Sequence, residues 1–329
     1  MELLSMKPLE KIRVLDITYY LPGPFSTMRL AEMGAEVVKI EPPGGDPAFS
    51  MSGGAVHRAN NRGKDILKLD LKTEKGKAEL VQHIKHADVL LESFRPGVMD
   101  RLGLGYKKVK EINPSIVYCS MTGYGVDGPL ANFGSHDLNY LALSGVLSQI
   151  ADSNGKPIIP KNTLADYAGG FAVSESILAA LVQRFRTGEG SQIQVSITDA
   201  MATFQGTNLE YLISGISGDG IPEIDGSYVS YNIYETKDGR YVALAALEPK
   251  FWTNFCLFAK RPDWISYQFE RTESKEHQKI TELFASRTWE EWYQISLETD
   301  FCLTPVLRPA ELSQHPHFAN RGNLVSLKC

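Results

Sequence analysis

Residues 13–41, with the sequence RVLDITYYLPGPFSTMRLAEMGAEVVKIE, decide the fold class of this chain. Residues 13–18 form a short apolar run that is typical of a buried strand, and residues 36–41 form a second one. Between them, a Pro-Gly-Pro turn at residues 22–24 precedes a stretch with Phe25 and Leu30 on one helical face. A strand, a helix and a second strand in this order predict a parallel βαβ unit.

The same alternation continues along the first half of the chain. Further strands are predicted at residues 66–71, 88–94, 116–122 and 192–197, and a further helix at residues 73–87. Residues 166–185 form the clearest helix, because Phe171, Leu178 and Phe185 recur on one stripe. We therefore expect a Rossmann-like α/β domain with a parallel sheet, whose ligands bind beyond the C-terminal ends of the strands.

The character of the sequence changes after Tyr211. Residues 214–227 are rich in Gly, Ser, Asp and Pro and predict a linker, and residues 233–244 predict a hairpin that turns at Lys237-Asp238-Gly239. Residues 248–299 are mostly helical in pattern. We expect a smaller α+β domain at residues 213–303. The large domain then comprises residues 1–212 together with a returning tail at residues 304–329.

Composition argues against several classes of protein. The 329 residues carry 34 Lys and Arg against 39 Asp and Glu, and this net charge of −5 is a poor match for nucleic acid. The four cysteines include no C-x-x-C pair, so we expect neither a metal site nor a disulfide framework. The N-terminus lacks the apolar run of a signal peptide, and no window approaches the roughly 20 apolar residues of a membrane span. We expect a cytoplasmic protein with no membrane partner.

One string matches a phosphate-binding motif, G-x-G-x-x-G at residues 123–128. Pro129 follows it, and no amphipathic helix begins there, although the dinucleotide fingerprint needs a helix N-terminus to hold the pyrophosphate. The signatures of phosphate-loop NTPases, serine hydrolases and zinc peptidases do not occur in the sequence either. The sequence therefore gives no support for a nucleotide cofactor.

Two acid/base residues precede predicted helices. His136 stands beside a carboxylate in the segment GSHDLNY, and Asp166 begins the clearest helix. On their residue types alone, a role as a helix cap is the simpler interpretation of each. Gly169 and Gly170 follow Asp166, and glycine in a helix costs stability. These glycines are reasonable if a group approaches the backbone closely, so we expect a ligand at this helix start.

Several long motifs, in order along the chain, resemble the class III CoA-transferase family. They are residues 22–47 (PGPFSTMRLAEMGAEVVKIEPPGGDP), 70–80 (DLKTEKGKAEL), 87–106 (ADVLLESFRPGVMDRLGLGY), 112–125 (INPSIVYCSMTGYG), 164–170 (LADYAGG) and 186–200 (RTGEGSQIQVSITDA). The resemblance covers residues 9–323. It implies a two-domain α/β fold in which two chains interlock into a homodimer. It also implies an acyl-CoA thioester substrate, with no cofactor beyond its coenzyme A moiety.

Three segments resemble the racemase branch of this family. Residues 134–148 match the segment of the catalytic histidine, which implies that role for His136, and residues 164–170 imply a catalytic role for Asp166. Residues 246–251 match a motif whose glutamate, here Glu248, supports the histidine. The resemblance implies that His136 and Asp166 invert the α-carbon of a 2-methylacyl-CoA by proton transfer. We expect N–H groups at the Asp166 helix start to stabilise the enolate oxygen.

The transferase branch offers a different use of the same aspartate. There Asp166 attacks the thioester and forms first a mixed anhydride and then an aspartyl-CoA thioester. His136 and Glu248 have no required role in that reaction. A third alternative is a homologue that binds a CoA thioester without catalysis, and the presence of all three residues argues against it.

The phosphates of coenzyme A require cationic partners. Arg95 lies in FRPG, a segment that matches a coenzyme A contact of the family, and Arg58, Arg62 and Lys64 are further candidates. Relatives often carry an arginine directly after the equivalent of Glu41. This chain has two prolines there instead.

Overall fold

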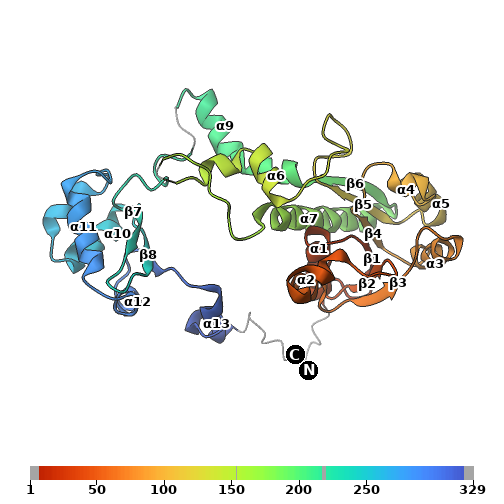
Figure 1. Ribbon diagram of the computed structural model, residues 1–329, viewed down its shortest axis with the longest axis horizontal. Coiled ribbons are helices and arrows are strands. Elements are labelled where there is room, and N and C mark those ends of the chain that lie inside the picture. The colour runs from red at the N-terminus through yellow and green to blue at the C-terminus, as the bar shows by residue number, and fades with distance from the viewer. Residues whose placement is uncertain (1–6, 153, 217–219, 322–329) are drawn as a thin grey trace. The chain divides into compact units, whose positions relative to one another are not determined.

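The computed structural model describes residues 7–152, 154–216 and 220–321. The chain divides into two compact units, Met1–Gly215 and Ile216–Cys329, and each is described by itself below (Figure 1).

A six-stranded parallel sheet forms the centre of the first unit, in the order β3-β2-β1-β4-β5-β6 (Figure 1). Its strands are β1 (Arg13–Ile17), β2 (Glu36–Glu41), β3 (Asp65–Lys68), β4 (Val89–Glu92), β5 (Val117–Thr122) and β6 (Ser191–Ser196). The predicted Rossmann-like sheet is thereby confirmed. The chain first builds outward from β1 to β3 and then returns to place β4 on the other side of β1. Such a reversal leaves a crevice between the C-terminal ends of β1 and β4, where ligands of open α/β sheets bind.

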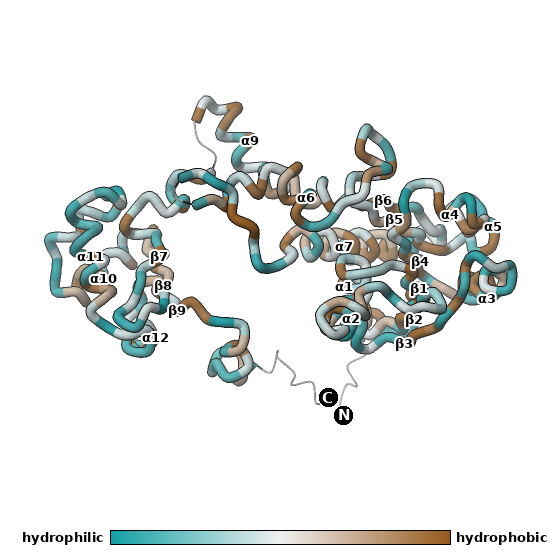
Figure 2. The backbone as a smooth tube through the Cα atoms, in the orientation of Figure 1, coloured by the Kyte–Doolittle hydropathy of each residue, from teal (hydrophilic) through white to brown (hydrophobic). Residues whose placement is uncertain are grey.

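Helices cover both faces of this sheet (Figure 1). The helices of the first unit are α1 (Pro22–Glu32), α2 (Ala55–Asn61), α3 (Glu74–Ile84), α4 (Val98–Arg101), α5 (Tyr106–Ile112), α6 (Asp137–Leu143), α7 (Leu164–Thr187), α8 (Ile197–Ala202) and α9 (Gly206–Ile213). Alternate strand residues point to opposite faces: Val14 and Val37 pack in the core with α1 and α7, whereas Leu15 and Val38 pack in the core with α3 and α5. The hydropathy colouring shows hydrophobic residues interspersed with hydrophilic ones along the strands (Figure 2).

Helix α1 begins at Pro22, so the Pro-Gly-Pro sequence is the first turn of the helix and not a turn that precedes it. The N–H groups of a first helical turn have no intrahelical partner, so proline costs nothing there. A Cβ atom on Gly23 would lie 2.4 Å from the Thr18 side chain. The start of α1 therefore packs closely on the segment that leaves β1.

Two glycines near the start of α7 serve helix packing. A Cβ atom on Gly169 would lie 2.8 Å from Cγ1 of Ile197, and one on Gly170 would lie 2.6 Å from Cδ1 of Phe25 and 2.8 Å from the Pro22 carbonyl oxygen. The group that approaches this backbone is therefore the protein itself, through α1 and α8. The expectation that these glycines make room for a ligand is wrong.

Replacing Gly170 with alanine is expected to destabilise the protein. Alanine in a helix normally gains about 1 kcal/mol over glycine, but overpacking a closed contact costs roughly 1–3 kcal/mol. The cost of overpacking is expected to exceed the gain in helix propensity here, because one contacting atom is a backbone oxygen that cannot rotate away. Thermal unfolding should show a lower Tm for Gly170→Ala. Gly206→Ala, where nothing lies within 4 Å of the added atom, is the matched control, and equal Tm values would contradict this account.

Helix α7 is long and apolar enough, by length and composition alone, to cross a membrane. In the first unit it packs against α1, α8, β5 and β6 instead, and Val173 and Ile177 on it are fully buried. A long core helix meets the same criterion.

The second unit contains a three-stranded antiparallel sheet with helices around an aromatic core. Its elements are β7 (Tyr231–Glu235), β8 (Tyr241–Ala245), α10 (Pro249–Phe258), α11 (Lys275–Ala285), α12 (Trp289–Glu298), β9 (Leu303–Pro305) and α13 (Pro316–Arg321). Trp252, Phe255, Phe284 and Trp292 are fully buried and pack ring against ring, with the rings of Phe255 and Phe284 stacked. The predicted hairpin is confirmed as β7 and β8, and the smaller unit is α+β as expected.

The described part of the C-terminal tail belongs to the second unit. Strand β9 pairs with β8, and Nη2 of Arg240 lies 2.8 Å from Oε2 of Glu311. The prediction that residues 304–329 return to the large domain is therefore wrong as far as residue 321, because this strand pairing and ion pair hold the tail on the smaller unit. Residues 322–329 lie outside the described residues. The boundary falls after Gly215 rather than after residue 212.

Candidate active site

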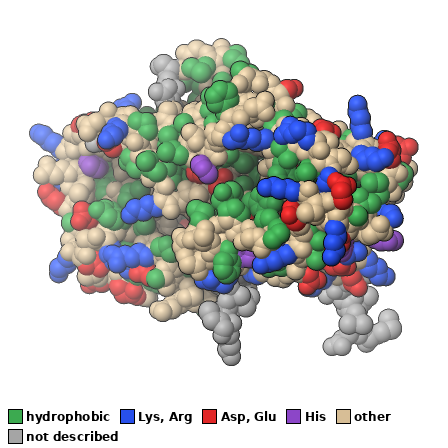
Figure 3. All heavy atoms as spheres, turned by 45° about the vertical axis from the view of Figure 1, so that its right-hand side comes forward, with side chains coloured by type: hydrophobic (Ala, Val, Ile, Leu, Met, Phe, Trp, Pro, Cys, Tyr) green, Lys and Arg blue, Asp and Glu red, His purple; other side chains and the backbone are tan. Residues whose placement is uncertain are grey.

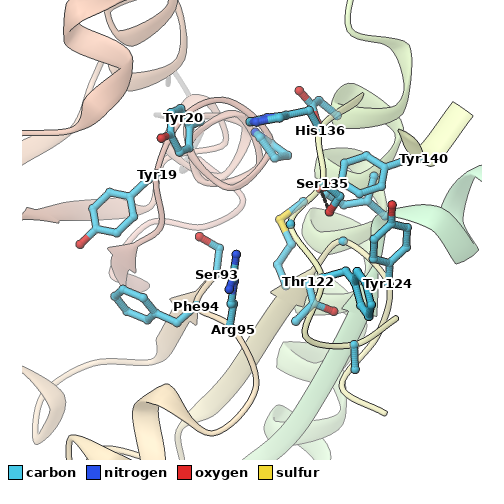
Figure 4. A pocket seen from close by; sticks show the side chains of 18 of the residues that line it. Tyr19, Tyr20, Ser93, Phe94, Arg95, Thr122, Tyr124, Ser135, His136 and Tyr140 are labelled. Atoms are coloured by element: carbon cyan, nitrogen blue, oxygen red, sulfur yellow. Dashed lines mark hydrogen bonds between the residues drawn. The ribbon is translucent and has the colours of Figure 1, made fainter. Parts of the chain in front are cut away.

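A cavity of about 360 Å³ lies at the C-terminal ends of β1, β4 and β5, where the sheet order predicts a crevice (Figure 4). Its walls come from the segments that follow these strands and from the starts of α6 and α7. His136 and Asp166, which lie 30 residues apart in the sequence, both line it. The fold thus brings together two of the three predicted catalytic residues.

His136 directly precedes α6 and is exposed to the cavity. Its backbone N–H donates to Oδ1 of Asn139 at 3.0 Å, so the side chain of Asn139 closes this helix end. The His136 ring lies at right angles to the Tyr20 ring, with 6.5 Å between the ring centroids (Figure 4). The asparagine therefore supplies the local helix-end contact, and the imidazole is left to face the cavity.

Asp166 is the third residue of α7 and is partly buried. Burial and, to a smaller extent, the neighbouring carboxylate of Asp137 together raise the pKa of its carboxyl from the usual 3.8 to about 7. A carboxyl group with a pKa near neutrality holds and releases a proton with similar ease. A perturbed acid beside a histidine in one cavity is a typical arrangement for proton transfer.

Asp137, which the sequence placed beside the histidine without a role, caps helix α7. Its Oδ1 accepts hydrogen bonds from the backbone N–H groups of Ala165, at 2.7 Å, and Asp166, at 3.0 Å. The cap of α7 is therefore Asp137 and not Asp166. The same two N–H groups are occupied, so the expectation that they stabilise an enolate oxygen is not supported by this geometry.

A hydroxyl pair offers another donor on the cavity wall. Oγ of Ser135 donates to Oη of Tyr140 at 2.9 Å (Figure 4). Because Ser135 acts as the donor, the hydroxyl hydrogen of Tyr140 remains available to another acceptor. Burial raises the pKa of Tyr140, so this hydrogen stays on the oxygen at neutral pH.

The structure separates the four cationic candidates for coenzyme A binding. Arg95 is exposed and lines both the active-site cavity and a neighbouring cavity of about 620 Å³. Arg58 and Arg62 lie on the surface, where Arg58 donates to the Gly53 carbonyl at 2.8 Å and Arg62 pairs with Glu32 at 2.5 Å. Only Arg95 of the four lines the cavity that holds His136 and Asp166.

Lys64 donates hydrogen bonds to groups of the protein itself. Its side chain is fully buried, and Nζ donates to Oδ2 of Asp16 at 3.0 Å, the Pro24 carbonyl at 2.7 Å and Oδ1 of Asn61 at 2.9 Å. An ammonium group has three donors, and all three are used. Burial lowers the pKa of Lys64 to about 8. The prediction that Lys64 contacts a coenzyme A phosphate is wrong on this geometry, because no donor remains for it.

Glu248 lies in the second unit and directly precedes α10, where its side chain is exposed. The segment before it is held by Gln268, whose Nε2 donates to the carbonyls of Ala246 at 3.1 Å and Leu247 at 2.6 Å. Its contact with the imidazole of His136 stays a prediction. Among the described residues, no group of three His, Cys, Asp or Glu side chains is placed to hold a metal ion.

The sequence and the fold of this chain are similar to those of known proteins. Residues 9–328 match the model of CoA-transferase family III. Human alpha-methylacyl-CoA racemase is 37% identical over 97% of this chain and 82% of its own length. Human succinyl-CoA:glutarate CoA-transferase is 31% identical over 98% of this chain and 77% of its own. The crystal structure of a CAIB/BAIF family protein from Brucella suis has a TM-score of 0.85 at 25% identity and covers 96% of this chain and 88% of that one.

The chain belongs to CoA-transferase family III. The resemblance noted in the sequence motifs is confirmed, and relatives of both the racemase and the transferase kind are similar to the chain along most of its length.

Proposed function

We propose that the chain is an acyl-CoA racemase or epimerase that inverts the α-carbon of a 2-methylacyl-CoA thioester. The observation that carries this proposal is the shared cavity of His136 and Asp166. Inversion requires one group to take the α-proton from one face of the carbon and another to deliver a proton to the opposite face. An imidazole and a carboxyl group on the wall of one cavity are suited to this, and their roles exchange with the direction of reaction.

Each inversion removes one proton from the α-carbon and delivers one proton to it. In one direction, Asp166 takes the α-hydrogen as a proton, the electron pair passes to the thioester oxygen as an enolate, and His136 as imidazolium returns a proton to the other face. In the opposite direction, His136 takes and Asp166 gives. The Asp166 pKa of about 7 supports the proposal, because the carboxyl then acts as base or acid at little cost near neutral pH. The chemistry needs no cofactor beyond the coenzyme A moiety.

CoA transfer through Asp166 is the second candidate, and the transferases among the similar proteins favour it. In that reaction the carboxylate oxygen attacks the thioester carbon and the thiolate of coenzyme A leaves. A nucleophile and a base must both be ionised, so the pKa of Asp166 allows either reaction, but CoA transfer leaves His136 in the same cavity without a required role. The racemase proposal agrees better with the site for this reason.

A chiral assay separates the two reactions. The protein is incubated with one enantiomer of a 2-methylacyl-CoA, and the appearance of the other enantiomer is followed by chiral chromatography of the released acids. Hydroxylamine is added in a parallel reaction with a free carboxylate acceptor. Formation of the second enantiomer without any hydroxamate at Asp166 supports the racemase. A hydroxamate at Asp166 without inversion over a range of acyl groups overturns it.

Arg95 is proposed to bind a phosphate of coenzyme A. Replacing it with glutamine is expected to raise KM for the acyl-CoA by about 10- to 100-fold, which corresponds to the roughly 1.5–3 kcal/mol of a charged hydrogen bond. Loss of the Arg95 charge should change kcat little, because the phosphates of coenzyme A lie far from the reacting carbon. Arg62→Gln is the matched control, because Arg62 is exposed and paired with Glu32. A KM equal to that of the wild type in Arg95→Gln would contradict this role.

A homodimer is also proposed. Large hydrophobic side chains are exposed on α7 and α9, and hydrophobic side chains gather at the top of the space-filling view (Figure 3). Those exposed on the two helices are Phe171, Val182, Phe185, Leu209, Leu212 and Ile213. Contiguous exposed apolar surface marks interaction sites in soluble proteins. Light scattering during size-exclusion chromatography should give twice the chain mass of 36.5 kDa, and a monomer at micromolar concentration would contradict the dimer.

A further inference from the structure

We propose that Asp137 is a positioning residue of the active site, which fixes the Asp166 carboxyl by holding the first turn of α7 against α6. The inference rests on the proposed role of Asp166 in proton transfer. Asp137 itself is not assigned a proton-transfer step.

Helix α7 begins without a cap from its own neighbouring residues. The first N–H groups of any helix lack partners within the helix and need an external acceptor. Thr163 precedes this helix, yet its hydroxyl makes no side-chain cap, and Oγ1 is buried without a partner among the described residues. Oδ1 of Asp137 accepts from both Ala165 and Asp166 instead. A helix of 24 residues therefore depends for its cap on a side chain that lies 27 residues before its first residue, Leu164.

Asp137 stands directly beside His136 in the chain. The residue that holds the backbone of Asp166 directly follows the histidine in the chain, at the start of the same helix, α6. The two hydrogen bonds that Asp137 accepts therefore tie the backbone at Asp166 to the residue that directly follows His136. A misplacement of about 1 Å between reacting groups can cost about 10²-fold in rate. A link of this kind limits such misplacement.

Asp137 also brings a negative charge close to Asp166. Asp137 adds a like charge beside Asp166 and so, after burial, contributes to the raised pKa of Asp166. Other titratable groups that line the same cavity are Tyr19, Tyr20, Arg95, Tyr124, His136 and Tyr140. Helices α1, α6 and α8 pack on α7: α6 carries Asp137 itself, α1 directs Arg29 toward Phe171 and Glu32, and α8 carries Asp199, which is exposed. Asp137 is the one carboxylate that bonds the Asp166 backbone within the described residues.

Two substitutions of Asp137 distinguish the effect of its hydrogen bonds to the start of α7 from the effect of its negative charge. Asp137→Asn keeps an oxygen that can accept both N–H groups but removes the charge, whereas Asp137→Ala removes both. Asp199→Asn, which makes the same charge change in the first turn of α8, is the control. The titration of the Asp166 carboxyl is measured in the free enzyme by ¹³C NMR with labelled aspartate, and Asp166→Asn identifies the resonance. The pH dependence of kcat and KM is measured alongside.

We expect the Asp166 titration to move to lower pH by about half a pH unit or more in both Asp137 variants, because a like charge is lost. We expect kcat to fall by about 10²-fold in Asp137→Ala, with KM little changed, because the reacting carboxyl and not the substrate is misplaced. Asp137→Asn should retain most of kcat, with the limb of its pH profile shifted to lower pH. The control should change neither the titration nor the profile.

The outcomes distinguish this inference from the proposed function. If the wild type fails to invert any 2-methylacyl-CoA, the proposed function is wrong, and the NMR titration still decides whether Asp137 acts on Asp166. If the wild type is active, an unmoved titration together with an unchanged kcat in Asp137→Ala overturns the inference. Should Asp137→Ala not fold, Asp137→Asn decides: an unmoved titration and pH profile in that variant would overturn it.

Discussion

Replacing Asp166 with asparagine is expected to lower the rate of inversion by about 10²–10⁴-fold, the usual contribution of an acid/base group. Asparagine has nearly the same shape but cannot take a proton. In the wild type, the direction in which Asp166 accepts the proton should accelerate as the pH rises through about 7, because the carboxyl ionises there. Steady-state assays of each enantiomer between pH 5 and 9 measure both effects.

The same variant has an expected effect on stability. The folded protein binds the Asp166 proton more tightly than the unfolded chain does, since the pKa rises from 3.8 to about 7 on folding. The free energy of unfolding that this group contributes therefore falls as the pH rises from 3.8 to about 7, and it stays lower above pH 7. Asp166→Asn should consequently have a higher Tm than the wild type at pH 8. Undiminished inversion together with an unchanged Tm would contradict the role of Asp166.

Replacing His136 with glutamine is expected to lower the rate of inversion by a comparable ~10²–10⁴-fold. Because the two groups lie on opposite faces of the carbon, however, exchange of the α-hydrogen with solvent should be lost for one enantiomer only. The enantiomer whose α-hydrogen faces Asp166 should still exchange that hydrogen with solvent, without inversion, while the other enantiomer should not. Chiral separation followed by mass spectrometry of each acid in deuterated water measures this.

This asymmetry also separates the candidate reactions. A CoA-transferase that uses Asp166 as nucleophile has no required role for His136, so His136→Gln would keep its activity. His277→Gln, at the start of α11 in the second unit, is a suitable control for the loss of an imidazole. If His136→Gln inverted both enantiomers as the wild type does, the two-sided mechanism would be wrong.

The sheet of the first unit could be predicted because each strand carries its own signal. The runs at residues 13–18 and 36–41 carry apolar residues on both sides, as is typical of strands covered by helices on two faces, and the structure places them as β1 and β2. Less predictable was the start of α1, because Pro22 and Pro24 equally well indicate a turn or a first helical turn. The tail was misassigned because a three-residue strand such as β9 has too short a pattern to recognise.

The candidate site was predicted only in part, for reasons that can be named. His136 and Asp166 were found through motif order, and the fold places both in one cavity. Lys64 was misassigned because a sequence shows the charge of a lysine but not the buried acceptors that occupy it. Asp137 was overlooked as a cap because it holds a helix 27 residues further along the chain, and N-cap patterns cover only a few neighbouring residues. Contacts of that length become visible only in three dimensions.

The central claim is that His136 and Asp166 transfer protons at the α-carbon of an acyl-CoA. The most direct measurement is incubation of the protein with a 2-methylacyl-CoA in D₂O, with deuterium at the α-carbon followed by ¹H NMR. We predict that one deuterium enters this position as the two enantiomers approach equal amounts, and that Asp166→Asn stops the inversion and confines exchange to the enantiomer whose α-hydrogen faces His136. No deuterium at the α-carbon over a range of acyl groups, with an active CoA transfer to a carboxylate, would contradict the account.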